Sequence, residues 1–491
     1  MSDARVDENQ VRLCGWSSVR ALARGERAGF LFLTCTKTDS GFRPAAGPGM
    51  TNGFCRSGAT RRVEPGTGCG PDLRVLRRNM RKRTAEGCGP CAVHAIMRGP
   101  FARFAAGTGH TLRCCAAAAS HPRFFFREQS VPIAAKFEIE YLQYLDAEGK
   151  QVRKDLPDFA QDIDQMVELY KLMVSTRVFD TKSIALQRTG KLGTYASCLG
   201  HEATHVGIGA SMKPEDVFAP SYREYGAQLY RGVRPRDVYM YWGGDERGND
   251  YQNEPAKHDF AWSVPIGTQC LHAAGSALAF KIRKEKRVAV CTIGDGGSSK
   301  ADFYGAINVA GARDLPLVAA IVNNQWAISV PRTIQSGAKT LAQKGIAAGL
   351  FCIQVDGNDI IAVKKAMGDA VERARAGKGG SVVECVTYRL GDHTTADDAR
   401  RYRGKDEVED AWTKDPVKRL RIWLEGKKAW NKKKEEKLQA ECDEWMDNEV
   451  NTYLETKAQP VTAMFDYTFA ELPADLLKQR DEAIALEQGS H

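Results

Sequence analysis

The stretch RVAVCTIGDGG, residues 287–297, decides how the chain is expected to fold. It opens on an apolar run rich in β-branched side chains, as is typical of a strand buried on both faces of a sheet. A second run of this kind, LPLVAAIV at 315–322, is followed by Asn323 and Asn324. A helical pattern over 302–312 lies between the two runs. The sequence therefore predicts a strand–helix–strand unit whose two strands are parallel.

The same alternation continues on both sides of this unit. A helical pattern over 360–376 precedes another apolar run, SVVECVTY, at 381–388. Upstream, apolar residues recur at helical spacing over 159–179. These patterns predict an α/β fold, in which a parallel sheet carries helices on both faces. We expect this domain to span 131–403 and a charged, helical C-terminal region to span 404–491.

Polar residues follow the two strands of the unit. Asp295 comes after the first strand and Asn324 after the second. Because parallel strands end at the same edge of a sheet, we expect both side chains at that edge, where ligands of such sheets bind. A carboxylate and a carboxamide oxygen suit Mg²⁺, which proteins commonly share with a diphosphate. Gly294, Gly296 and Gly297 would let the backbone approach phosphate closely. These residues predict a site for Mg²⁺ and a diphosphate.

Three longer segments extend this pattern: GDGGSSKADFYGAINVAGA (294–312), NNQWAISVP (323–331) and TYRLGDHTTADDARRYR (387–403). Together they resemble the alpha subunit of the first, decarboxylating component of bacterial 2-oxo-acid dehydrogenase complexes. The resemblance runs from about residue 131 to the C-terminus. It implies a thiamine-diphosphate-binding fold, with thiamine diphosphate and Mg²⁺ as cofactors.

The resemblance also assigns roles to individual residues. The residues that match the family's Mg²⁺ ligands are Asp295, Asn324 and, through its main-chain carbonyl, Trp326. Those that match its cofactor contacts are Tyr222, Arg223, Val264, Ile266, Gly294, Asp295, Gly296, Gly297, Asn324 and His393. Those that match its catalytic or substrate-pocket positions are His393, Arg389, Tyr195 and Ser197. Those that match a potassium site of branched-chain members are Ser263, Thr268 and Gln269.

By this resemblance, the chain is expected to take part in the oxidative decarboxylation of pyruvate and to pass the acetyl group to a lipoyl group of an acyltransferase. A branched-chain 2-oxo acid, 3-methyl-2-oxobutanoate, is the alternative substrate. Thiamine catalysis also needs a glutamate from a second α/β domain, and only one such domain is recognisable in this sequence. We therefore expect a separate beta subunit to supply that glutamate within an α2β2 heterotetramer, and no activity without it.

Residues 1–130 differ from the rest of the chain. They hold 21 Lys and Arg against 9 Asp and Glu, whereas residues 131–491 hold 49 against 52. Cys88, Cys91 and His94 could supply zinc ligands. A disordered extension, or a start site assigned too far upstream, is the preferred interpretation of this Arg-, Gly- and Cys-rich segment. The alternative from another class is a non-catalytic scaffold with a metal- or nucleic-acid-binding N-terminus.

The cysteines and the hydropathy bear on location. Outside residues 1–130 the six cysteines are scattered singly, which is typical of free thiols in a reducing compartment. No apolar run approaches the roughly 18 residues of a membrane helix. The polar opening MSDARVDENQ is unlike a secretory signal peptide. We expect a cytoplasmic enzyme that binds neither a membrane nor nucleic acid.

Overall fold

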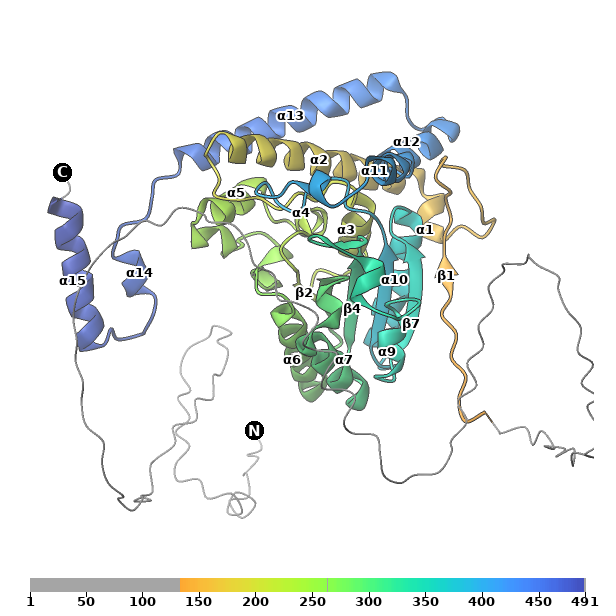
Figure 1. Cartoon of the computed structure of the whole chain (residues 1–491), viewed down its shortest axis with the longest axis horizontal. Coiled ribbons are helices and arrows are strands. Elements are labelled where there is room, and N and C mark those ends of the chain that lie inside the picture. Colours follow the sequence, from red (N-terminus) through yellow and green to blue (C-terminus); the bar gives the residue numbers. More distant parts are fainter. Residues whose placement is uncertain (1–132, 263, 490–491) are drawn as a thin grey trace, which may run out of the picture. The chain divides into compact units, whose positions relative to one another are not determined.

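The computed structural model describes residues 133–262 and 264–489, and residues 1–130, with the zinc ligands considered as an alternative (Cys88, Cys91 and His94), lie outside this part. One parallel sheet of six strands has the order β1-β7-β8-β4-β3-β2, so that β8 lies between β7 and β4 (Figure 1). Its strands are β1 (Tyr141–Leu142), β2 (Val217–Ala219), β3 (Ala289–Gly294), β4 (Leu317–Asn323), β7 (Phe351–Asp356) and β8 (Ser381–Val386). A separate antiparallel pair is formed by β5 (Trp326–Ala327) and β6 (Val330–Pro331). The predicted α/β class is confirmed.

Helices connect and cover the strands. The α-helices before β8 are α1 (Asp158–Gln161), α2 (Ile163–Arg188), α3 (Glu202–Gly209), α4 (Tyr225–Tyr230), α5 (Pro235–Gly243), α6 (Thr268–Arg283), α7 (Ala301–Ala312), α8 (Arg332–Gln335), α9 (Gln343–Ile346) and α10 (Ile360–Arg375). Those after it are α11 (Lys405–Thr413), α12 (Pro416–Gly426), α13 (Lys432–Glu455), α14 (Ala463–Asp466) and α15 (Ala474–Gly489). Short 3₁₀ turns are η2 (Glu246–Asn249), η3 (Ala256–His258), η4 (Gly297–Ser299) and η5 (Ala399–Arg401). None of these helices is both long enough and apolar enough to span a bilayer.

Both faces of the sheet are buried, which explains the unbroken apolar runs. Val288 and Val290 belong to the core shared with α2, α3 and α10. Ala289, Cys291 and Ile293 belong to the core on the opposite face, shared with α6 and α7. Successive residues of a strand point to opposite faces, so a strand covered on both sides needs apolar residues at every position.

The N-terminus of α10 is held by one buried carboxylate. Asp359 accepts hydrogen bonds from the main-chain N–H groups of Ile361 (3.0 Å) and Ala362 (3.3 Å), which caps the helix. It also accepts from the N–H groups of Tyr144 (2.5 Å) and Leu145 (2.7 Å), directly after β1. Asp359 therefore fastens the chain after β1 to the helix that covers β7 and β8.

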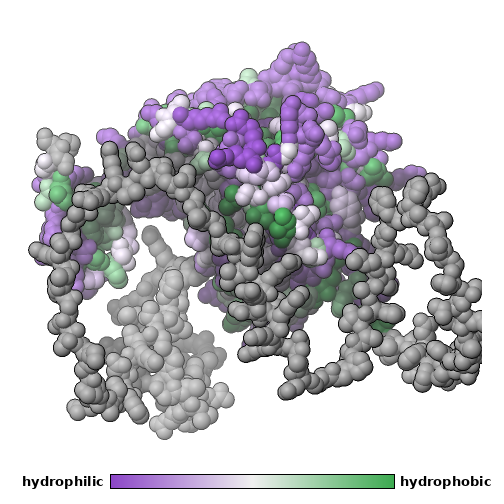
Figure 2. Space-filling view, viewed as in Figure 1, coloured by the Kyte–Doolittle hydropathy of each residue, from purple (hydrophilic) through white to green (hydrophobic). Residues whose placement is uncertain are grey.

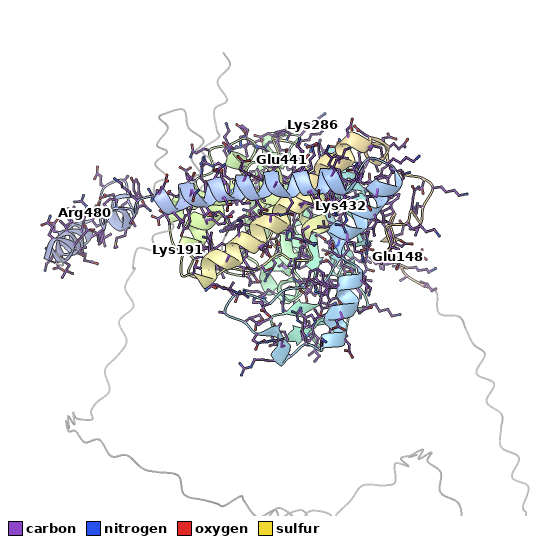
Figure 3. The ribbon with its side chains drawn as sticks, turned by 90° about the horizontal axis from the view of Figure 1, so that it is seen from above. Glu148, Lys191, Lys286, Lys432, Glu441 and Arg480 are labelled. Carbon is purple, nitrogen blue, oxygen red and sulfur yellow. The ribbon has the colours of Figure 1, made fainter. Side chains whose placement is uncertain are left out.

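The long helix α13 lies along α2 (Figures 1 and 3). The Tyr170 hydroxyl donates to the Glu435 carboxylate (2.8 Å), and Lys182 pairs with Asp447 (2.6 Å). The outer surface over α13 is mainly hydrophilic (Figure 2). Apolar residues of α12 and α13 join the core on the α2 side of the sheet. Helices α12 and α13 thus share that core with the region before residue 404.

Two stacked histidines are buried at α3, where His201 is the N-cap residue and His205 belongs to the first turns. The rings of His201 and His205 lie 5.3 Å apart at 13°. Both side chains are 0% exposed, and neither ring nitrogen of His205 has a hydrogen-bond partner in the described part of the chain. Burial lowers the pKa of His201 to about 3 and that of His205 well below its usual value. Both imidazoles are therefore neutral in the folded protein.

Candidate active site

The carboxyl ends of β3 and β4 form one wall of a cavity of about 560 Å³. Gly294 pairs with Val322 in the parallel register, so the residues that follow these strands emerge side by side. The lining residues are Thr194, Ala196, Ser221, Tyr222, Arg223, Glu224, Trp242, Val264, Ile266, Gly294, Asp295, Gly296, Gly297, Lys300, Val322, Asn324, Trp326, Ala327, Ile328, His393 and Thr394. All the residues predicted to contact the cofactor or Mg²⁺ are among them.

Asp295 and Asn324 bring two oxygen donors to this cavity. Asp295 is 2% exposed, and its Oδ2 accepts a hydrogen bond from Gln335 Nε2 (2.6 Å). Burial raises the pKa of Asp295, while the hydrogen bond from Gln335 opposes that shift. Asn324 Oδ1 accepts from the Trp326 N–H at 3.3 Å. A buried carboxylate beside a carboxamide oxygen is a donor set that fits a hard cation such as Mg²⁺.

The Trp326 carbonyl, the third predicted metal ligand, faces a different group. It accepts a hydrogen bond from Arg389 Nη1 at 3.0 Å. A carbonyl oxygen has a second lone pair, so this contact leaves one position for a cation. The Trp326 indole donates to Glu407 (2.8 Å), which fixes the ring beside the cavity. Its role as a ligand stays a prediction.

The glycines of the loop after β3 differ in what surrounds them. A Cβ on Gly296 would lie 2.4 Å from the Ala327 side chain, and one on Gly297 would lie 2.8 Å from Ile293. A Cβ on Gly294 would meet nothing within 4 Å. Gly296 and Gly297 are therefore required for packing of the turn, and only Gly294 faces open space.

Two buried arginines converge on His393. Arg223 Nη2 and Arg389 Nη1 each lie 3.2 Å from His393 Nδ1. Within the described residues neither guanidinium forms an ion pair with a carboxylate, whereas buried Arg231 and Arg419 each pair with an aspartate at 2.6 Å. Buried guanidinium groups without a counter-charge favour an anion as ligand. Arg223 lines the cavity and fits a diphosphate, whereas Arg389, predicted at a catalytic position, does not line it and lies behind His393 and the Trp326 carbonyl.

The tautomer of His393 follows from these contacts. Two guanidinium donors face Nδ1, so Nδ1 accepts and the proton resides on Nε2. Nε2 lies 3.4 Å from the Tyr222 hydroxyl. Burial, and then Arg223 and Arg389, lower the pKa of His393 to about 3. His393 is therefore neutral at physiological pH, with an N–H donor at Nε2.

The segment 194–197 turns alternate residues toward the cavity. Thr194 and Ala196 line it. The hydroxyls of Tyr195 and Ser197 instead donate to buried Asp180, at 2.8 and 2.6 Å. This differs from the expectation that Tyr195 and Ser197 line the substrate pocket. Their contacts anchor the segment, and the Ser197 carbonyl accepts a hydrogen bond from Arg223.

The segment before α6 supplies an apolar wall and part of the predicted potassium set. Val264 is 49% exposed at the edge of the cavity, and Ile266 lines it further in. The Gln269 carboxamide donates to the Thr292 carbonyl (2.8 Å) and accepts from the Gly267 N–H (3.1 Å). Thr268 begins α6. Ser263 lies outside the described residues, so the potassium site stays a prediction.

Among the lining or neighbouring residues that were not predicted, two contact residues of the predicted site. Gln335 on α8 reaches Asp295, and no sequence pattern marks it. Glu224 is 3% exposed and accepts from the Arg223 N–H at 3.1 Å, and burial raises its pKa to about 7. Its position beside Tyr222 and Arg223 in PSYREYG was the one available signal.

The sequence of this chain is similar to those of known proteins. Residues 170–462 match the family model described as "Dehydrogenase E1 component". The chain belongs to the dehydrogenase E1 component family. It is 40% identical over 347 residues to the pyruvate dehydrogenase E1 component subunit alpha of Staphylococcus epidermidis. This alignment covers 70% of this chain and 92% of the Staphylococcus protein.

Other relatives in the dehydrogenase E1 component family differ in their named substrate. The pyruvate dehydrogenase E1 component subunit alpha of Acholeplasma laidlawii is 39% identical over 341 residues, covering 69% of this chain and 97% of that one. The 3-methyl-2-oxobutanoate dehydrogenase subunit alpha of Mycobacterium tuberculosis is 38% identical over 350 residues, covering 70% and 94%. The predicted family resemblance is confirmed.

Proposed function

We propose that this chain is the alpha subunit of a pyruvate dehydrogenase (acetyl-transferring). It would act in the oxidative decarboxylation of pyruvate and pass the acetyl group to a lipoyl group of the acyltransferase. The observation that carries the proposal is a single cavity that is lined by Asp295, Asn324 and Arg223, and Arg223 has no carboxylate partner among the described residues. Relatives at 39 and 40% identity that are named for pyruvate favour this substrate.

The residues of the cavity fit thiamine diphosphate with Mg²⁺. Asp295, Asn324 and the Trp326 carbonyl would hold the metal, and Arg223 with Tyr222 would hold the diphosphate. When bound, thiamine diphosphate supplies the electron sink for decarboxylation of a 2-oxo acid. A K⁺ ion at Ser263, Thr268 and Gln269 is part of the same proposal.

The chain's own residues would orient the reactants and exclude water. Neutral His393 offers its Nε2 proton to an anionic oxygen, while Arg223 and Arg389 keep its Nδ1 occupied. A donor fixed in this way needs little reorganisation during reaction, which favours stabilisation of developing charge. Ile266, beside Gly297, would present an apolar surface that supports the cofactor and keeps that part of the cavity dry.

A beta subunit would complete the site. Apolar Val264 and Ile328 line the cavity, yet they are 49% and 53% exposed. Apolar side chains at the mouth of a polar site favour cover by another protein surface. The beta subunit would also bring the glutamate that activates the cofactor, in an α2β2 heterotetramer. A cytoplasmic location stays a prediction.

Steady-state rates on pyruvate and on 3-methyl-2-oxobutanoate, with the beta subunit and the lipoyl acyltransferase present, test the proposal. We expect kcat/KM to be higher for pyruvate. A clear preference for the branched acid would instead assign the chain to the branched-chain type, to which the relative at 38% identity belongs. No turnover of either acid would remove the enzymatic proposal altogether.

A further inference from the structure

Lys344, on α9, is a buried cation without a role in the site described above. It is 6% exposed. Its Nζ donates to the Ser298 carbonyl (2.9 Å), the Ser298 hydroxyl (2.7 Å) and the Ser299 hydroxyl (3.1 Å). Among the described residues no carboxylate lies within ion-pair distance of it, unlike the partly exposed Lys365, which pairs with Asp369. Burial of an ammonium without a counter-charge is unfavourable, so its retention needs a reason.

Ser298 connects Lys344 to the loop that carries Asp295. The Ser298 hydroxyl accepts from Lys344 and donates its own proton to the Asp295 carbonyl at 2.6 Å. Ser298 and Ser299 form the turn η4, which directly follows Gly296. Two ends of the segment 295–299 are therefore tied together by one hydrogen-bonded chain. That segment brings the Asp295 carboxylate into the cavity.

The position of the Lys344 ammonium also bears on the loop from Asp295 to Ser299. Lys344 does not line the cavity, whereas Asp295, Gly296 and Gly297 do. The ammonium therefore lies behind a turn whose front faces the predicted anion. Burial lowers the pKa of Lys344 to about 8, so the group is still mostly protonated at neutral pH. A positive charge close behind such a turn favours a negative ligand in front of it.

We propose that Lys344 is a positioning residue for the cofactor site: through Ser298 it holds the loop from Asp295 to Ser299 in the shape that receives Mg²⁺ and the diphosphate. Lys344 acts on the cofactor only through this loop. The inference rests on the proposed function, because it assumes that the cavity binds Mg²⁺ and thiamine diphosphate.

The test uses the full chain with its beta subunit and compares variants of it with the wild type. Titration calorimetry with thiamine diphosphate in the presence of Mg²⁺ gives the Kd. We expect Lys344→Met to raise Kd by about 10-fold or more, as losing an outer-shell partner does, and Lys344→Arg to restore most of the affinity. Lys364→Met is the matched control, because Lys364 is part-buried, donates to the Ala210 carbonyl (3.2 Å) and lies over the Phe159 ring.

A second measurement separates positioning from a general loss of structure. At saturating cofactor, we expect the KM for the 2-oxo acid to stay within about two-fold of wild type in Lys344→Met. Wild-type Kd in this variant would overturn the inference, and so would an equal loss in Lys364→Met. If Lys344→Met does not fold, Ser298→Ala keeps the lysine and removes the link. Unchanged Kd in Ser298→Ala would then overturn it. If the wild-type protein binds no thiamine diphosphate, the proposed function itself fails.

Discussion

Single side chains at the carboxyl edge of the sheet determine which ions the cavity can accept. Asp295 is buried beside one neutral amide, Gln335, and burial raises the pKa of its carboxyl group. A bound cation would reverse this effect, because it stabilises the carboxylate far more than a hydrogen bond from an amide does. Metal binding and ionisation of Asp295 are therefore expected to be coupled.

Replacing Asp295 tests this at the residue scale. Asp295→Asn keeps the size and the hydrogen bond but removes the charge, so we expect Mg²⁺-dependent binding of thiamine diphosphate to weaken by about 100-fold, at least as much as loss of an outer-shell partner. Calorimetry with and without Mg²⁺ measures it. Asp369→Asn is the control, because Asp369 is 61% exposed on α10. Equal Mg²⁺-dependent affinity in Asp295→Asn and wild type would refute the metal assignment.

Most of the cavity could be predicted from the sequence, and the exceptions have physical reasons. Asp295 and Asn324 follow apolar strands, so chain topology alone brings them to one edge. The side-chain directions of Tyr195 and Ser197 could not be predicted. Successive residues of an extended segment point in opposite directions, and the sequence does not show which of the two sets faces the cavity. Gln335 comes from a four-residue helix with no periodic signal.

The same contrast holds for helices and strands. The long apolar runs and amphipathic patterns predicted β3, β4, β8 and α10 to within a few residues. β1 and β2 have two and three residues, too few to show a period. β7 was missed because Gln354 interrupts its short apolar run. The length of an element and an uninterrupted apolar pattern decided whether it could be predicted from the sequence.

The cap of α10 supports a prediction at the element scale. Asp359→Ala removes the acceptor of four main-chain N–H groups, two in the helix and two after β1. We expect the free energy of unfolding to fall by about 2–4 kcal/mol, because the helix cap is lost and buried N–H groups are left without an acceptor. Chemical denaturation measures it.

Asp162 at the start of α2 provides the comparison for this variant. Within residues 133–262 and 264–489 its side chain accepts from the Gln165 N–H alone (3.1 Å), and it is exposed to solvent. Asp162→Ala should therefore lower the free energy of unfolding by about 0.5–1 kcal/mol. Equal losses in Asp162→Ala and Asp359→Ala would contradict the coupling of β1 to α10 through one carboxylate.

At the scale of the whole molecule, His201 and His205 make stability depend on pH. Their folded pKa values lie below the unfolded value of about 6.5. The unfolded chain thus binds protons that the folded chain does not. The contribution of the two neutral histidines to the free energy of unfolding is complete above about pH 6.5. Below that pH it declines by about 1.4 kcal/mol per pH unit for each histidine. In urea unfolding at pH 7.5 and 5.5, the histidine contribution appears as a difference between proteins: stability should fall less at pH 5.5 in His205→Leu than in wild type, while Glu224, with a pKa raised to about 7, opposes the fall equally in both. His258→Leu, at a side chain 39% exposed, is the control and should leave it unchanged.

The N-terminal segment gives a second prediction at this scale. The family match begins at residue 170, and the relatives are covered over 92–97% of their length by about 70% of this chain. We therefore expect removal of residues 1–130 to leave kcat/KM for the 2-oxo acid within about two-fold of the full chain. Loss of activity in a truncated chain that still folds would contradict the proposal that this segment is dispensable.

The order of the strands has a consequence for synthesis on the ribosome. β8 is the last strand of the sheet to be made, yet it pairs with β4 on one side and β7 on the other. A nascent chain that ends before Ser381 therefore leaves both neighbours with unpaired edges. His393 is also absent at that stage. The cofactor must then bind after this central strand has been inserted. Chains that stall earlier expose two unpaired strand edges, which can aggregate or bind chaperones.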